Sequence, residues 1–168
     1  MKIEINNKSL SLELLRNILT DEIVISLSKG VKDKIIDSSK FVKNKSEGND
    51  SIYGINTGFG NLANVKIDKQ DLKKLQRNLV SSHAVGVGAL LPNKIVKLII
   101  VLKIYALAQG YSGASLTLVQ RLCDFINLEL YPCIPSKGSV GASGDLAPLA
   151  HLSQALIGEG HVNYKGVK

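Results

Sequence analysis

The sequence predicts a mainly α-helical fold with a small β element at the N-terminus and two long loops. Six segments have the apolar spacing or composition of helices, whereas strand-like alternation is limited to the first and the last residues of the chain. Two stretches that contain several glycines, residues 51–67 and 137–148, have no helical period. These two loops contain the most unusual residues of the chain and are the first candidates for a site.

The first third of the chain begins with a predicted strand. Residues 1–5 alternate between polar and apolar side chains, as a half-buried strand does. A helix is predicted next over residues 10–19, and a weaker one, interrupted by Gly30, over residues 23–42. A polar loop follows, and it leads into the irregular stretch 51–67.

The rest of the chain is predicted to be helical between its loops. Asp68 can cap a helix that runs to residue 82. Pro92 begins the next helix, residues 92–109, which is apolar on nearly all sides. We expect other helices, or a subunit interface, to cover this helix all round. Two more helices are predicted, over residues 115–130 and 146–157.

The end of the chain is predicted to form one strand and the start of a hairpin turn at Lys165-Gly166. A hairpin that opens there has no return strand. The apolar helix over residues 92–109 also needs more partners than this sequence supplies. Both features predict that the chain is a piece of something longer.

The composition is that of an ordinary globular protein. Apolar residues make up 45% of the 168 residues and charged residues 21%, which excludes the composition of a disordered chain. Lys and Arg number 21 against 14 Asp and Glu, so the net charge is +7. However, few of the basic residues are arginines, Trp is absent and aromatic residues are 5%. Because nucleic-acid binding commonly uses arginine forks and stacking aromatics, we expect no nucleic-acid partner.

The cysteines and the apolar runs exclude further classes. Cys123 and Cys133 are ten positions apart, outside any zinc-ligand spacing, and they are too few for a disulfide framework. The N-terminus lacks the apolar run of a signal peptide. Lys97 and Lys103 interrupt the most apolar stretch, residues 95–108, which is too short to span a membrane. We expect a cytoplasmic protein with no metal and no membrane partner.

The second loop has two chemical interpretations. Glycines at intervals of three between Gly138 and Asp145 could hold an anion, but the Lys-Ser/Thr ending of a phosphate-binding loop is missing. Alternatively, Ala142-Ser143-Gly144 can cyclise, because glycine provides an unhindered attacking nitrogen and serine can lose water. Within the first loop, Gly58-Phe59-Gly60 fits a loose dinucleotide pattern, but no strand precedes it, so we expect no nucleotide.

Four motifs resemble, in order, those of the aromatic amino acid ammonia-lyases, a family that includes the histidine, phenylalanine and tyrosine lyases and related aminomutases. They are YGINTGFG (53–60), LQRNLVSSHAVGVG (75–88), GYSG (110–113) and GSVGASGDLAPLAH (138–151). The resemblance extends over nearly the whole chain and implies the N-terminal part of the L-aspartase-like ammonia-lyase helical fold. Residues 1–168 would then be the N-terminal portion of the domain, without its C-terminal helical bundle.

The resemblance implies a cofactor made from the chain itself. Ala142, Ser143 and Gly144 correspond to the residues that become 4-methylideneimidazol-5-one (MIO), with Asp145 assisting the cyclisation. MIO would act in covalent catalysis on the substrate's amine. No metal and no nucleotide is implied.

The resemblance also assigns roles to the other motifs. Tyr53 would be the general base that removes the substrate's β-proton. Ser82, His83 and Gly60 would bind the substrate. The pair Ser82-His83 resembles that of histidine-specific members, whereas phenylalanine lyases have an apolar pair there. Taken alone, a tyrosine or histidine in the position of Tyr53 or His83 is more often a structural side chain, and the assignment depends on the motifs occurring together.

The implied reaction is the non-oxidative elimination of ammonia from L-histidine to give trans-urocanate, the first step of histidine degradation. The family also implies a homotetramer, with active sites built from several subunits. Two alternatives remain open at this stage. One is a lyase that acts on phenylalanine or tyrosine, and the other is a truncated, catalytically inactive fragment.

Overall fold

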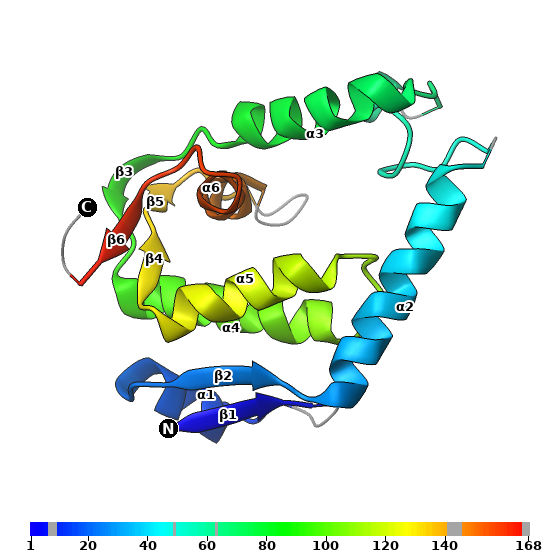
Figure 1. Ribbon diagram of the computed structural model, residues 1–168. Coiled ribbons are helices and arrows are strands. Elements are labelled where there is room, and N and C mark those ends of the chain that lie inside the picture. The colour runs from blue at the N-terminus through cyan, green and yellow to red at the C-terminus, as the bar shows by residue number, and fades with distance from the viewer. Residues whose placement is uncertain (7–9, 49, 63, 141–145, 166–168) are drawn as a thin grey trace.

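A computed structural model describes residues 1–6, 10–48, 50–62, 64–140 and 146–165. Its described part is mainly helical, as the sequence predicts (Figure 1). The helices are α1 (Leu12–Thr20), α2 (Lys29–Ser46), the 3₁₀ turn η1 (Gly60–Leu62), α3 (Lys69–His83), α4 (Asn93–Ala108), α5 (Leu116–Asn127) and α6 (Leu146–Leu156). The strands are β1 (Lys2–Ile5), β2 (Val24–Leu27), β3 (Val87–Leu90), β4 (Leu130–Pro132), β5 (Pro135–Lys137) and β6 (Val162–Tyr164).

Helices α4 and α5 lie side by side at the centre of the molecule (Figure 1). Pro92 precedes α4 and Ser115 caps α5, where its hydroxyl accepts the Leu118 N–H. The two helices supply much of the core, including Val96, Ile100, Val101, Ile104, Val119, Leu122 and Ile126. The prediction that α4 is covered on all sides holds only in part within this chain, because Leu102 is 43% exposed.

The N-terminal segment is a β1-α1-β2 unit with a parallel strand pair. The prediction of helix over residues 23–42 is wrong for its first part, since Val24–Leu27 form β2. The four residues of β2, of which Val24 and Ile25 are β-branched, alternate between exposed and buried positions and pair with β1, which outweighs the helical pattern. Helix α2 begins after Ser28, whose hydroxyl accepts the Val31 N–H, and it runs to Ser46.

The remaining strands form two short antiparallel pairs, β3 with β5 and β4 with β6. The sequence does not predict β3, β4 or β5, because three- and four-residue strands show little alternation. The last strand has a partner within the chain, whereas the predicted hairpin turn at Lys165-Gly166 extends beyond the described residues. Tyr164 lies opposite Leu130 in β4, so this strand pairs with a segment earlier in the chain.

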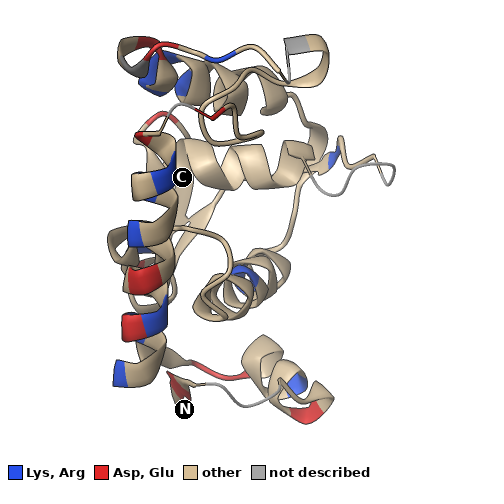
Figure 2. Cartoon of the chain, turned by 90° about the vertical axis from the view of Figure 1, so that its right-hand side faces the viewer, with Lys and Arg blue, Asp and Glu red and all other residues tan. Residues whose placement is uncertain are grey.

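Helix α3 lies across one side of the molecule, and its main contact is with α6 (Figure 1). None of its residues whose burial is described is buried. Charged side chains of both signs lie along the solvent-facing side of α2 (Figure 2), whose other side buries Val31 and Ile35. No helix in the described ranges is both long and apolar enough to cross a membrane.

The Asn127 side chain joins the central helices to the N-terminal sheet. Its Oδ1 accepts the Ile25 N–H at 2.7 Å, and its Nδ2 donates to the Ile25 carbonyl at 3.0 Å. The N–H and the carbonyl of Ile25 lie on the edge of β2 that faces away from β1, and these two bonds give both groups a partner.

Replacing Asn127→Ala should therefore lower the free energy of unfolding by about 1 to 2 kcal/mol, because two backbone groups lose their partners. Urea denaturation measures the change. Asn44→Ala, on the exposed side of α2, is the matched control and should change the free energy by less than about 0.5 kcal/mol. Equal effects of the two substitutions would contradict this role of Asn127.

Candidate active site

The loop between α2 and α3 is organised by the buried Asn56 side chain. Its Oδ1 accepts the Ile52 N–H at 2.7 Å, and its Nδ2 donates to the Asp50 carbonyl at 2.9 Å. Thr57, also buried, forms an isolated antiparallel bridge with Lys66. These contacts fix the loop on both sides of Tyr53 and Phe59, because an amide that bonds two backbone groups closes the chain into a turn.

Tyr53 lies on the surface of this loop, with its ring against Phe59. The ring centroids are 5.7 Å apart and the planes are inclined at 71°, an edge-to-face pair. Tyr53 is 62% exposed. The contact therefore orients the ring and leaves most of the side chain accessible.

His83 ends α3, and its tautomer follows from its hydrogen bonds. Its Nδ1 lies 2.8 Å from the Leu79 carbonyl and 3.2 Å from the Ser82 hydroxyl. Since a carbonyl oxygen can only accept, Nδ1 carries the proton, and in the neutral ring the lone pair is on Nε2. The Ser82 hydroxyl donates to the same carbonyl at 3.0 Å. Ser82 thus helps to hold the His83 ring.

Tyr53 and His83 line one cavity of about 480 Å³ between the loop, α3 and α6. This volume lies within the range of small-molecule sites. The wall is mostly apolar, and its described residues are Tyr53, Phe59, Leu79, Val80, His83, Leu146, Leu149, Ala150 and Ser153. The Ser153 hydroxyl donates to the Leu149 carbonyl at 2.8 Å, so its proton is already used.

Two of the other predicted site residues, Ser82 and Gly60, are described, and neither lines the cavity. Ser82 is next to His83 but does not line the cavity. Gly60 begins η1 with φ +58°, which suits glycine, and it does not line the cavity either. Ala142, Ser143, Gly144 and Asp145 lie outside the described residues. Leu146, the next residue of the chain, does line the cavity.

The apolar wall is a part of the site that no motif of the sequence identifies. Leu79 and Val80 belong to the apolar stripe of α3, which predicts only a packed helix face. The same holds for Leu149 and Ala150 of α6. The signal that could have found them is their position one helical turn from His83 or from the second loop.

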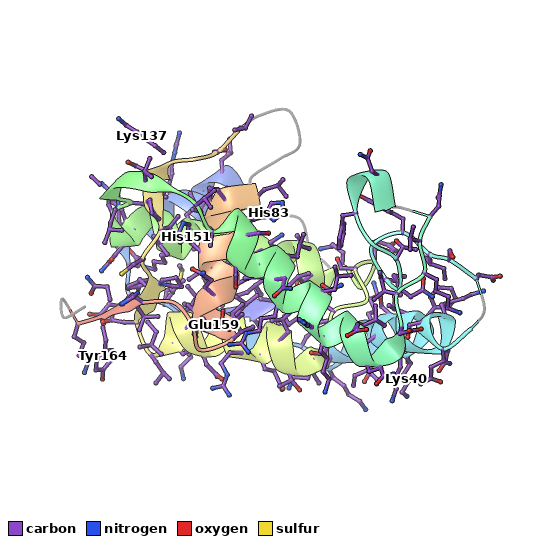
Figure 3. All side chains as sticks on the ribbon, turned by 90° about the horizontal axis from the view of Figure 1, so that it is seen from above. Lys40, His83, Lys137, His151, Glu159 and Tyr164 are labelled. Atoms are coloured by element: carbon purple, nitrogen blue, oxygen red, sulfur yellow. The ribbon has the colours of Figure 1, made fainter. Side chains whose placement is uncertain are left out.

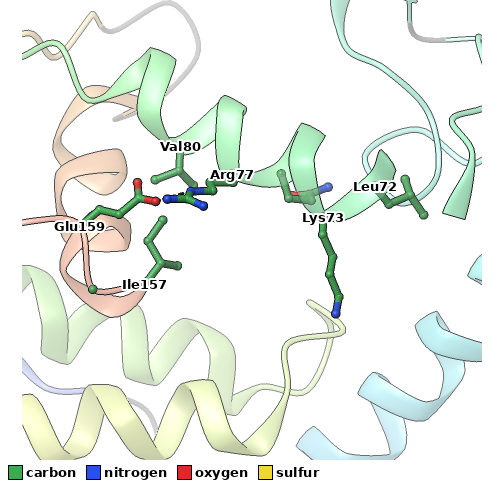
Figure 4. A pocket seen from close by; sticks show the side chains of 8 residues that line it. Leu72, Lys73, Arg77, Val80, Ile157 and Glu159 are labelled. Carbon is green, nitrogen blue, oxygen red and sulfur yellow. Dashed lines mark hydrogen bonds and ion pairs between the residues drawn. The ribbon is translucent and has the colours of Figure 1, made fainter. Parts of the chain in front are cut away.

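A carboxylate connects α3 to the segment after α6. Glu159 accepts the Arg77 Nε–H through Oε1 and the Ser81 hydroxyl through Oε2 at 3.2 Å. Figure 4 shows the ion pair at one end of a second cavity, of about 610 Å³, which Leu72, Lys73 and Ile157 also line. Figure 3 shows His83, His151 and Glu159 along the region where α3 and α6 meet.

The described residues contain no group of three or more His, Cys, Asp or Glu side chains that could hold a metal ion. Burial raises the pKa of the Cys123 thiol to about 11, so at neutral pH this side chain is a protonated core residue. The chemistry available in the described cavity is therefore that of a phenol and an imidazole beside an apolar wall.

Comparison with protein families gives one match. The model of the family described as aromatic amino acid lyase matches residues 10–168. Among curated proteins, the chain is 49% identical to the histidine ammonia-lyase of Vibrio cholerae and 52% identical to that of Legionella pneumophila. Each alignment covers 157 residues, 94% of this chain and 31% of the relative.

Solved structures agree with this match. An ergothionase from Treponema denticola has a TM-score of 0.93 at 27% identity, over 99% of this chain and 33% of that one. A histidine ammonia-lyase from Trypanosoma cruzi has a TM-score of 0.87 at 29% identity, over 100% of this chain and 32% of that one. The chain thus spans about a third of the length of these relatives, and the predicted fold class is confirmed.

The Arg77–Glu159 pair should contribute to the attachment of α3. In a double-mutant cycle with Arg77→Ala and Glu159→Ala, we expect a coupling energy of about 0.5 to 1 kcal/mol, reduced by added salt, because the pair is partly exposed. Urea denaturation of the four proteins at two salt concentrations measures it. The control is the more exposed pair Arg121–Asp124, at 3.7 Å, which should couple less. Equal coupling in both cycles would contradict the expectation.

Proposed function

The chain belongs to the aromatic amino acid lyase family, and on that basis we propose that it is the N-terminal portion of a histidine ammonia-lyase. The proposed reaction removes ammonia from L-histidine and gives trans-urocanate. The observation that carries the proposal is the cavity that Tyr53 and His83 both line, because Leu146, two residues after the Ala-Ser-Gly segment, lines it as well. Curated relatives at about 50% identity that are named histidine ammonia-lyase support the choice of substrate.

We propose that Ala142, Ser143 and Gly144 form MIO, with Asp145 assisting, and that no metal or nucleotide takes part. The residue types fit this group, because glycine gives an unhindered nitrogen and alanine leaves its carbonyl accessible. The position also fits, since Leu146 belongs to the cavity wall and Gly144 is two residues before it. When formed, MIO supplies an electrophile for the substrate's amine.

The side chains of the cavity account for the other requirements of the elimination. The reaction takes a proton from the β-carbon and releases ammonia, which leaves a double bond next to the imidazole ring. The Tyr53 oxygen is the proposed acceptor of the β-proton. The lone pair on His83 Nε2 can accept an N–H of the substrate imidazole, and Leu79 and Leu149 can pack on its ring.

Ser82 and Gly60 have indirect roles in this proposal. Ser82 positions His83 through the shared contact with the Leu79 carbonyl. Gly60 does not line the described cavity, and its proposed contribution to substrate binding is to shape the Tyr53 loop at η1, where its positive φ suits glycine. The complete protein is proposed to include the C-terminal helical bundle and to act as a homo-oligomer, a tetramer, in the cytoplasm.

The first test is the reaction itself. The full-length protein should convert L-histidine to urocanate, followed by ultraviolet absorbance, with much lower activity on L-tyrosine and L-phenylalanine. Ser143→Ala should lose nearly all turnover, and its mass should lack the loss of two water molecules, because alanine cannot form the methylidene group. Ser136→Ala, on exposed β5, is the matched control.

Three results would redirect the proposal. Normal turnover by Ser143→Ala would exclude MIO chemistry at this segment. Preference for tyrosine or phenylalanine would favour the alternative lyases. An unprocessed full-length protein that is inactive on all three amino acids would contradict the lyase proposal, and an unprocessed product of only 168 residues would favour the inactive fragment.

Tyr53→Phe should lower kcat by about a hundredfold or more, because it removes the proposed base and keeps the ring contact with Phe59. The loss of two water molecules should persist in its mass spectrum. Tyr164→Phe, on β6, loses the same hydroxyl outside the cavity and should retain the wild-type kcat. An unchanged kcat in Tyr53→Phe would remove this residue from the base role.

A further inference from the structure

His151 lies on α6 and makes a hydrogen bond to the segment that follows α3. Its Nε2 accepts the Gly86 N–H at 3.0 Å, across 65 positions of the sequence. Gly86 is three residues after His83. In Figure 3 both histidines lie where α3 and α6 meet. His151 therefore connects the helix that begins at the Ala-Ser-Gly loop to the segment that carries His83.

Gly86 is also in close contact with the strand before that loop. A Cβ atom at Gly86 would lie 3.0 Å from His151 Nε2 and 3.2 Å from the Lys137 carbonyl oxygen. Both distances are shorter than ordinary van der Waals contact, so a side chain at this position would push the segments apart. Gly86 thus allows its backbone to fit between β5 and α6.

Gly138, the residue after β5, also lies close to Gly86. A Cβ atom there would lie 3.0 Å from Gly86 Cα and 3.3 Å from Ala147 Cβ, and its φ of +137° is accessible mainly to glycine. Gly138 precedes the loop with Ala142–Asp145, and Ala147 follows it. Both flanks of this loop therefore meet at Gly86.

From these contacts we propose that His151 is a positioning residue for the Ala-Ser-Gly loop. The hydrogen bond that it accepts from Gly86 sets α6, and so the C-terminal flank of the loop, against the backbone that follows His83. His151 does not line the cavity of Tyr53 and His83, so it acts through the backbone and does not touch the substrate. The inference rests on the proposed function for its catalytic consequence, but the contact itself is independent of the reaction.

The protonation state of His151 agrees with this role. To accept the Gly86 N–H, Nε2 must carry a lone pair, so the ring is neutral with its proton on Nδ1. Burial lowers the pKa of His151, which favours the neutral ring at neutral pH. Cys133 and His161 are the titratable residues that line the small cavity beside this ring.

The test compares two substitutions of His151 in the full-length protein. His151→Leu removes the acceptor, whereas in His151→Gln the side-chain Oε1 replaces Nε2 as acceptor of the Gly86 N–H. Three quantities are measured: hydrogen exchange in the peptide that contains Gly86, the fraction of chains that have lost two water molecules, and kcat per processed chain. His161→Leu is the matched control, because His161 is an exposed histidine beside the same small cavity.

In His151→Leu, we expect exchange at Gly86 to be about tenfold faster, and kcat per processed chain or the processed fraction to fall by about the same factor. In His151→Gln, the exchange rate at Gly86 and the catalytic quantity that fell should both return to within about threefold of the wild type. His161→Leu should change neither the exchange rate nor the catalytic quantities. Wild-type exchange and processing in His151→Leu would overturn the inference. If His151→Gln does not restore exchange and processing, the inference is overturned as well. This second variant decides the question even where His151→Leu does not fold.

The two proposals fail in different ways. If the wild type is processed but does not act on histidine, the proposed substrate is wrong, while exchange and processing in the His151 variants still decide the positioning role. If His151→Leu shows the exchange and the processing of the wild-type protein, the positioning role is wrong whatever the substrate is.

Discussion

The site depends on the pairing of α3 with α6. Helix α3 has no buried residue among those whose burial is described, so the apolar core does not hold it in place. Polar contacts do this instead: His151 with Gly86 at one end, and Glu159 with Arg77 and Ser81 near the middle. Since the cavity lies between these two helices and the Tyr53 loop, its shape depends on contacts worth about 1 kcal/mol each.

The core supports the site indirectly, through α6. Ala147, Ala150 and Leu152 of this helix are buried, and Leu152 belongs to the same cluster as Ile100 and Leu122. Elements with few buried contacts open locally at lower free energy than the core does. Helix α3 and the Tyr53 loop therefore form the more easily opened side of the cavity, whereas α6 is its fixed side.

The helices could be predicted from sequence because each has an apolar face or a capping residue near its own ends. The short strands could not be predicted in this way, because each depends on a partner elsewhere in the chain. Strand β6 pairs with β4, more than thirty residues earlier, and β2 pairs with β1. The same division holds at the site. Motifs identified Tyr53 and His83, but Leu149 and Glu159 gain their roles only from the approach of α6 to α3, which no local pattern encodes.

The polar groups near the cavity divide into those that hold the structure and those that face a ligand. Asn56 is bonded to the backbone of its own loop, Ser82 to the Leu79 carbonyl, and Ser153 to the Leu149 carbonyl. Among the described lining residues, this leaves the Tyr53 oxygen and the His83 ring as polar groups for a ligand. A buried polar group of a ligand needs a partner, whereas apolar ring atoms pack on leucines. A flat ring that also carries an N–H can pack on the leucines and donate to His83 Nε2, whereas a phenyl ring can only pack on the leucines.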